Sequence, residues 1–246
     1  MSMADDYPRV AFSGLDGLVV SFAPHFDDTA NRAALALRAR IEAENWSELR
    51  ETASSLVSTL IRFDPLSGSS ERLRDRVLTL LEGWDWRNAE LPEGRRRLVI
   101  PASFDPDIAP QSDEAAAAAG LSGRDALIEA VCGADLRVLT IGFAPGQPYI
   151  GQLPEFLDLP RQRKLTPRVP VGALGLAIRQ LVLFAVDTQT GWRHVGQTAM
   201  RLFQPGKEDP FLLRPGDVLR FHPVSAADLS PLWDDPRGGA RIEDIA

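Results

Sequence analysis

The sequence predicts an α+β protein with two domains, a small antiparallel sheet with helices followed by a domain of short strands. Three observations support this prediction. Amphipathic helices alternate with β-rich runs between residues 9 and 82, segment 84–94 lacks periodicity, and strands and turns dominate beyond residue 137. The domains are expected at residues 7–90 and 95–224. Residues 225–246, rich in proline, glycine and acids, are expected to form a flexible tail.

The first domain is predicted to place its helices on one face of an antiparallel sheet. A first helix, capped by Asp27 or Asp28, is expected to reach residue 44, because its apolar residues recur on one helical face. A second helix is expected to begin after Ser69 or Ser70. The β-rich runs that would form the sheet are residues 10–12, 18–22 and 56–63.

The second domain contains many short strands interrupted by glycine and proline. This pattern is typical of a β-barrel or a β-sandwich. Two short helices are expected at residues 113–119 and 123–131. The predicted strands are residues 98–102, 137–143, 181–186, 194–203 and 218–221.

Composition excludes several classes of protein. The chain has 246 residues, of which 44% are hydrophobic, and a formal net charge of −7. An acidic chain argues against general nucleic-acid binding. No stretch approaches the roughly 20 apolar residues that span a bilayer, and acids stand where a secretory signal would be basic. We therefore expect a soluble, cytoplasmic protein with no membrane association and no nucleic-acid partner.

Cysteine and histidine are too scarce to predict a disulfide or a metal site. Cys132 is the single cysteine, and His25, His194 and His222 lack the i, i+4 spacing of a helix-borne zinc pair. No histidine has an obvious nucleophile beside it, and no G-x-S-x-G motif is present. Cys132 follows a predicted helix instead of preceding one, so we interpret it as a packed or partly exposed thiol.

The most unusual local composition is the run Gly142-Phe-Ala-Pro-Gly-Gln-Pro-Tyr-Ile-Gly151. Proline fixes φ and glycine permits backbone shapes closed to other residues, so this loop is expected to hold one defined shape. It lacks the spacing of nucleotide-binding loops. It is either a structural hairpin connection or a rigid loop in which Gly146 and Tyr149 shape a cleft.

A basic segment, residues 160–170, follows this loop within the acidic chain. Arg161 and Arg168 are its candidate ligands for a carboxylate or phosphate, because guanidinium groups match the geometry of both. The alternative is a solvated surface loop. Gln180, between apolar neighbours, needs a partner if it is buried, either a core hydrogen bond or a contact that orients a ligand.

These motifs together resemble the KipI family, also described as the B-type subunit of 5-oxoprolinase, allophanate hydrolase subunit 1, or the carboxyltransferase domain, subdomains C and D. The resemblance covers residues 8–223. It is carried by Gly142-Phe-Ala-Pro-Gly-x-Pro-Tyr-x-Gly151, Pro160-Arg, Pro167-Arg-Val-Pro170, Gly191-Trp192-Arg, Gly196-x-Thr198 and Leu213-x-Pro-Gly-Asp217.

The resemblance implies a cyclophilin-like β-barrel as the second domain. It also implies one component of an ATP-dependent amidohydrolase that opens 5-oxoproline to glutamate, and not an enzyme on its own. Its partners would be a homologous C-type subunit (allophanate hydrolase subunit 2) and an A-type ATPase component. The complex would use ATP, which this chain need not bind. The substrate would be a small carboxylate or amide. The alternative is a non-catalytic regulatory module, such as a KipI-like inhibitor of a histidine kinase.

The sequence departs from the family pattern at several positions. Val131 stands where relatives carry histidine, Gln147 where an aromatic residue is usual, Leu181 where threonine is usual, and Gln197 where arginine is usual. The glycine and proline framework is kept. This is the pattern expected when the fold and the partner are retained and the original catalytic chemistry has changed or been lost.

Overall fold

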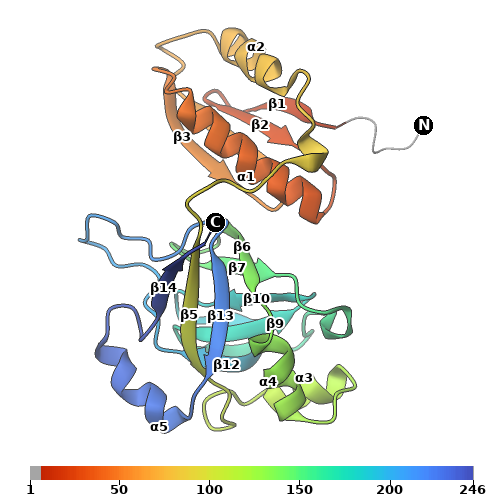
Figure 1. The fold of residues 1–246 in the computed structure, drawn as a ribbon, viewed down its shortest axis with the longest axis vertical. Helices are drawn as coiled ribbons and strands as arrows, with labels where there is room; N and C mark the ends of the chain where they lie inside the picture. The colour runs from red at the N-terminus through yellow and green to blue at the C-terminus, as the bar shows by residue number, and fades with distance from the viewer. Residues whose placement is uncertain (1–6, 246) are drawn as a thin grey trace. The chain divides into compact units, whose positions relative to one another are not determined.

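Figure 1 shows the fold of the chain, a computed structural model that describes residues 7–245. It contains two compact units, divided between Glu93 and Gly94. The predicted domain limits at residues 90 and 95 lie on either side of this division. No helix within the described residues is long and apolar enough to cross a membrane.

The first unit is a four-stranded antiparallel sheet with two helices. The strands follow the order β1-β2-β4-β3 and are β1 (Arg9–Ser13), β2 (Gly17–Ser21), β3 (Leu49–Ser54) and β4 (Ser58–Phe63). The helices are α1 (Asp28–Ala43) and α2 (Ser70–Leu81). Asp27 and Ser69 cap them, each accepting a hydrogen bond from a backbone N–H of the first turn. The N-caps predicted from the sequence are confirmed.

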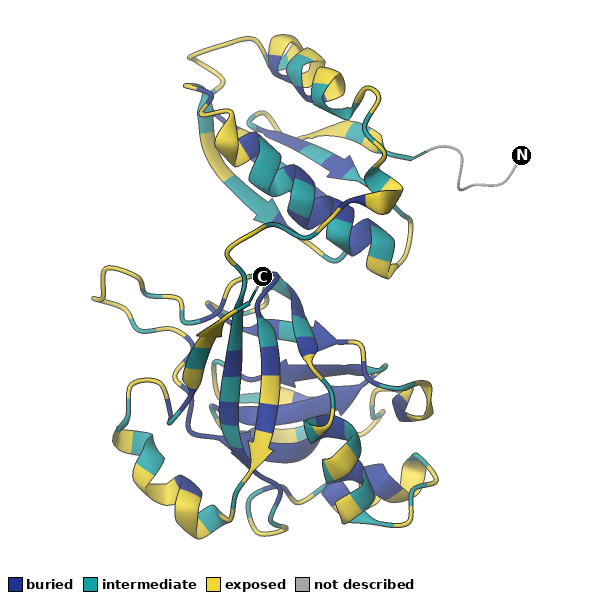
Figure 2. Ribbon diagram, in the orientation of Figure 1, coloured by how far each residue is buried: buried dark blue, intermediate teal, exposed yellow. Residues whose placement is uncertain are grey.

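The core of the first unit lies between α1 and the sheet, as the buried stripe along α1 shows in Figure 2. Two tryptophans of the segment predicted to be a linker belong to this unit. Trp84 and Trp86 contact the buried ring of Phe22, with ring centroids 6.0 and 5.4 Å away. A short 3₁₀ helix, η2 (Trp86–Asn88), carries the second of them. This segment has no periodic apolar pattern because two isolated tryptophans, and not the face of a helix, pack it against the first unit.

The second unit is a closed barrel, which confirms the barrel over the sandwich. Its strands follow the order β12-β9-β10-β7-β6-β13-β5, and β12 pairs back with β5. All neighbours are antiparallel except β13 and β5. The strands are β5 (Arg96–Ser103), β6 (Leu136–Ile141), β7 (Pro148–Gly151), β9 (Ala173–Ala177), β10 (Gln180–Leu183), β12 (Arg193–Thr198) and β13 (Val218–Pro223).

Two helices complete the core of the barrel. The predicted helices are present as α3 (Ser112–Ala118) and α4 (Arg124–Cys132). Their apolar residues Ala115, Leu127 and Val131 are fully buried in the same cluster as the barrel interior. A separate two-stranded sheet pairs β8 (Thr166–Val169) with β11 (Thr188–Thr190), and η3 (Glu155–Leu157) lies between β7 and β8 in the chain.

The C-terminal residues are built into the barrel unit, where a flexible tail was expected. They form α5 (Ala226–Leu229), η4 (Ser230–Asp234) and β14 (Arg241–Asp244), and β14 pairs antiparallel with β5. Leu229 is 1% exposed and Ala240 is part of the barrel core. Short apolar contacts and backbone pairing hold this segment, and neither gives a periodic sequence signal.

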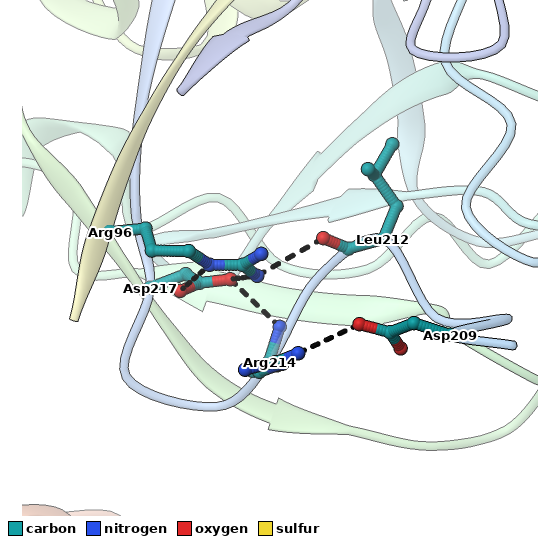
Figure 3. A network of polar contacts seen from close by, with 5 residues as sticks. All are labelled: Arg96, Asp209, Leu212, Arg214 and Asp217. Atoms are coloured by element: carbon teal, nitrogen blue, oxygen red, sulfur yellow. Dashed lines mark hydrogen bonds and ion pairs between the residues drawn. The ribbon is translucent and has the colours of Figure 1, made fainter. Parts of the chain in front are cut away.

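A buried ion pair ties the loop before β13 to β5, as Figure 3 shows. Asp217 accepts hydrogen bonds from Nε and Nη2 of Arg96 at 3.1 and 2.5 Å, and from the backbone N–H of Arg214 at 2.9 Å. Arg96 also donates to the carbonyl of Leu212. The motif Leu213-x-Pro-Gly-Asp217 therefore has a structural role, because its carboxylate satisfies a guanidinium inside the barrel unit.

Candidate functional site

Strands β7, β9, β10 and β12 separate two sets of side chains. Successive residues in a strand point to opposite faces, so Leu174, Leu176, Leu181 and Leu183 fill the interior. The residues that alternate with these leucines point the other way and form a second cluster on the outer face. Strand β8 adds one residue to this cluster, and the turn after β11 adds another. This outer cluster consists of Val169, Ala173, Ala177, Val182, Phe184 and Trp192, with Tyr149 packed against it.

Strand register places a tyrosine and a histidine on the outer face. Tyr149 lies opposite Val182, Val182 opposite Gly175, and Gly175 opposite His194. Residues directly opposite each other in antiparallel strands share a face. A Cβ on Gly175 would lie 2.7 Å from the ring of Phe184 and 2.9 Å from Cβ of Trp192, so this glycine makes room for both aromatic residues.

Tyr149, Trp192 and Arg161 form a continuous stack. The rings of Tyr149 and Trp192 meet edge to face, 6.0 Å between centroids, and Cζ of Arg161 lies 5.0 Å from the centroid of Trp192. Two contacts hold the basic segment here: Arg193 donates to the carbonyl of Pro160, and the backbone N–H of Gln162 donates to the carbonyl of Gly191.

The guanidinium of Arg161 is exposed and forms no ion pair within residues 7–245. It remains available to an anion that approaches the outer face.

Arg168 lies apart from this stack. Its neighbour Val169 points into the outer cluster, so Arg168 points away, and its exposed guanidinium is paired with Asp187. The carboxylate of Asp187 also accepts the backbone N–H of Val171. The hydrogen bonds from Arg168 and then from Val171 hold the pKa of Asp187 below its usual value. Of the two candidate arginines, the geometry brings only Arg161 to the outer cluster.

In the loop of residues 142–151, Gly146 and Gln147 restrict the backbone. Gly146 has φ +75°, and a Cβ there would lie 2.8 Å from the backbone oxygen of Leu202, so another residue would be both strained and crowded. Gln147 is buried, and its side-chain oxygen accepts the backbone N–H of Ala185. Gln147 thus fastens the loop to the chain beyond β10, and Gly146 shapes the loop without reaching the outer cluster.

Gln180 lies at the start of β10 and is 5% exposed. It is opposite both Gly151 and Ala177, two positions from Val182, so its side chain is on the outer face. Among the predicted site residues, Tyr149 and Gln180 therefore lie on the outer face, and Arg161 reaches this face through its contact with Trp192.

Two polar residues of β12 that were not among the candidate site residues lie on the same face. His194 and Gln197 are 5% and 4% exposed. The bulge between His194 and Gly196 breaks the simple alternation, so both side chains point outward although they are three residues apart. Burial lowers the pKa of His194, an effect opposed by hydrogen bonding of the imidazole to the side chain of Gln197 and to the backbone of Gly196. The imidazole is therefore neutral at pH 7.

The outer face offers binding chemistry and no preassembled nucleophile. Within the described residues, no group of three or more His, Cys, Asp or Glu side chains is arranged to hold a metal ion. Cys132 is partly buried against the barrel core, in agreement with a packed or partly exposed thiol, and this burial raises its pKa to about 12. Val131 and Leu181, two of the positions that depart from the family pattern, are fully buried in the barrel core. The outer face therefore offers the rings of Tyr149 and Trp192, the guanidinium of Arg161 beside them, and neutral polar side chains.

Fold and sequence together place the chain in a known family. The model of the carboxyltransferase domain, subdomains C and D, matches residues 8–213. The chain belongs to this family.

Two relatives share one name. The chain is 36% identical over 154 residues to the B-type subunit of 5-oxoprolinase from Escherichia coli O157:H7, which is 62% of this chain and 70% of that protein. It is 24% identical over 229 residues to the B-type subunit of 5-oxoprolinase from Bacillus subtilis (strain 168), which is 87% of this chain and 92% of that protein.

The crystal structure of TTHA0988 is similar with a TM-score of 0.70 and 29% identity. The match covers 85% of this chain, but this chain spans only 40% of that longer one.

Proposed function

We propose that this chain is the B-type component of an ATP-dependent amidohydrolase of the 5-oxoprolinase type. It works with a homologous C-type protein and an A-type ATPase component, and the complex consumes ATP. The observation that carries the proposal is the stack of Tyr149, Trp192 and Arg161 on the outer face, in a chain whose relatives are named as 5-oxoprolinase components of the B type.

The stack suits a small ring that carries a carboxylate. A flat ring packs on the faces or edges of Tyr149 and Trp192, and Arg161 at the rim pairs with the carboxylate. Gln180 beneath supplies an amide that orients the bound group. Opening a lactam adds water across the C–N bond, and the hydrolysis of ATP to ADP and phosphate drives this resistant step. Because the outer face within residues 7–245 offers no preassembled nucleophile, the other components carry out the phosphoryl chemistry.

The test is reconstitution. The chain is co-expressed with the C-type and A-type proteins of the same organism, and phosphate release is measured with and without 5-oxoproline. The proposal expects 5-oxoproline-dependent ATP hydrolysis. Arg161→Ala is expected to raise KM for 5-oxoproline about tenfold or more, because a charge-assisted contact is lost. Arg163→Ala is the matched control, since this exposed arginine lies two residues away. No lactam-dependent hydrolysis with all components present contradicts the proposal.

A non-catalytic regulatory module is the second candidate. It is favoured by the full burial of Val131 and Leu181, which gives these positions a packing role in place of a polar one. A KipI-like module would bind a histidine kinase through its surface. Affinity purification from the native cell distinguishes the two, because recovery of the C-type protein without any signalling protein contradicts the regulatory candidate.

A further inference from the structure

The two edges of the sheet in the first unit differ in how they are protected. The order β1-β2-β4-β3 leaves β1 and β3 each paired on one side only, within the part of the chain that the structure describes (Figure 1). In β3 the register shifts between Leu49 and Glu51, and Arg50 and Glu51 are charged, which are features that block an edge. Strand β1 pairs with β2 in an unbroken register, and Arg9 is its one charged residue. The edge of β1 is therefore open to a further strand.

The backbone of β1 has hydrogen-bonding groups available for such a strand. In an antiparallel pair, every second residue directs its N–H and C=O away from the partner strand. Because β2 lies on one side of β1, these groups point to the free edge. A free edge of this kind readily pairs with a strand of another molecule.

The apolar side chains of β1 continue the core of the first unit out to this edge. Phe12 lies opposite Leu18, and Leu18 lies opposite Ile61, so the three side chains form one row on the core face of the sheet. Leu18 and Ile61 are fully buried, whereas Phe12 is 46% exposed. Val10, on the same face, is only partly buried against the core. A strand added beside β1 would cover Phe12 and extend the row.

Strand β1 is complementary to a second copy of itself. If two copies pair antiparallel about Ala11, every residue of the strand is paired: Ala11 faces Ala11, Val10 faces Phe12, and Arg9 faces Ser13. Val10 and Phe12 then meet on the core face, where an aromatic and a β-branched residue form a favourable pair.

This register also suits the backbone and the charges. Residues that face each other differ in number by zero, two or four, so the free N–H and C=O groups of one strand meet those of the other. Neither copy of Arg9 faces a like charge. The net charge of −7 opposes association of copies in general, but β1 contains no acid.

We propose that β1 is a dimerisation edge through which two copies of this chain join their four-stranded sheets into one. The partner is a second copy because the strand complements itself in shape, backbone and charge. This inference concerns the first unit and is independent of the proposed function, whose candidate residues lie in the second unit.

Sedimentation equilibrium of the full chain over a range of concentrations tests the dimer. The mass is expected to rise from 26.9 kDa toward twice that value. Ala11→Lys sets two ammonium groups opposite each other and is expected to weaken dimerisation about fivefold or more. Ala11→Glu does the same with two carboxylates. An equimolar mixture of the two variants is expected to restore the dimer, because opposite charges then face each other.

The control lies on the opposite edge of the same sheet. Glu51→Gln in β3 changes the net charge by one unit, as Ala11→Lys does, and is expected to leave dimerisation unchanged. Ala11 is exposed, so its substitution leaves the core of the first unit intact, and circular dichroism verifies that each variant folds.

Oxidative cross-linking tests the register. Residues directly opposite each other have Cα atoms about 4.5–5.5 Å apart, which a disulfide can span. Ala11→Cys is therefore expected to give a covalent dimer. Ser13→Cys is the control, because the two copies of residue 13 would lie about 13 Å apart along the strands. Cys132 is present in both variants and contributes the same background.

Four results overturn the inference. The first is a mass of 26.9 kDa at every concentration. The second is a dimer that Ala11→Lys does not weaken, which would show that copies associate through another surface. The third is equal cross-linking at positions 11 and 13. The fourth is a monomer in which Ala11→Lys abolishes binding of the C-type protein, which would show that the edge pairs with a different chain.

Discussion

Asp217→Ala is expected to destabilise the barrel unit strongly, because Asp217 is the buried centre of the network in Figure 3. Its residue is 3% exposed, and the side chain of its partner Arg96 is 18% exposed. The substitution removes two charge-assisted hydrogen bonds and one bond to a backbone N–H, and leaves the guanidinium of Arg96 with the carbonyl of Leu212 alone.

The magnitude follows from the burial of the pair. Removing one member of a buried ion pair costs about 3–5 kcal/mol. Arg96 retains some exposure and one carbonyl partner, so the lower end applies, about 3 kcal/mol, which is a change of more than about 100-fold in the folding equilibrium. Asp217→Asn keeps the shape and an acceptor oxygen, so its effect is expected to be smaller.

Hydrogen exchange measured by mass spectrometry is the appropriate assay, because peptides from the barrel report that unit separately from the first unit. Arg214→Ala is the control: it breaks the pair between Arg214 and Asp209, whose side chains are 62% and 59% exposed, and is expected to cost less than about 1 kcal/mol. If Asp217→Ala reduces the protection of barrel peptides no more than Arg214→Ala does, the reasoning from burial is wrong.

Three further predictions concern single positions. Cys132, with its pKa raised to about 12 by burial, is expected to resist iodoacetamide in the folded chain at pH 8 and to react only in denaturant; rapid native labelling would contradict this. Ile178, 44% exposed at φ +45° in the turn between β9 and β10, is strained, so Ile178→Asn is expected to raise the melting temperature of the barrel by relieving about 1 kcal/mol; a lower value would mean that its contacts outweigh the strain. Arg168→Ala is expected to leave the fold intact and to raise the pKa of Asp187, measured by a carbon NMR titration. In the unchanged chain, the stabilisation from Asp187 is present above the pKa of this carboxyl in the unfolded state and is lost as pH falls through its pKa in the folded state. An unchanged pKa in the variant would show that the hydrogen bond from Val171 alone lowers it.

Sequence patterns predicted the elements whose signals are local. The helix caps at Asp27 and Ser69 were predicted because a side-chain oxygen before an apolar helical face is a local signal. Strand β3 was missed because it is an edge strand in which only Ser54 is buried, so apolar alternation is absent. The C-terminal segment was misjudged for a related reason: β14 is held by pairing with β5, far away in the sequence.

The candidate site likewise contains residues that have local sequence signals and residues that have none. Tyr149 and Arg161 stand in conspicuous motifs, and the structure brings them together through Trp192. His194 was considered only as a metal ligand or a base, because the bulge that sets its direction gives no signal in the sequence. Its position on the outer face follows only from the pairing of β12 with β9 and of β9 with β10.

The pairing of β14 with the first half of β5 also bears on how copies of this chain avoid one another. Residues 96–99 of β5 pair with β14 on one side, whereas β12 takes over only at residues 102 and 103. Without β14, every second residue of this stretch of β5 would present unpaired N–H and C=O groups to the strand of another molecule. By pairing with this edge, β14 prevents a strand of another molecule from pairing with it. A chain truncated before residue 241 would keep the strand order of its barrel but would expose an unpaired strand edge. Loss of this short strand would therefore show as self-association before it showed as unfolding.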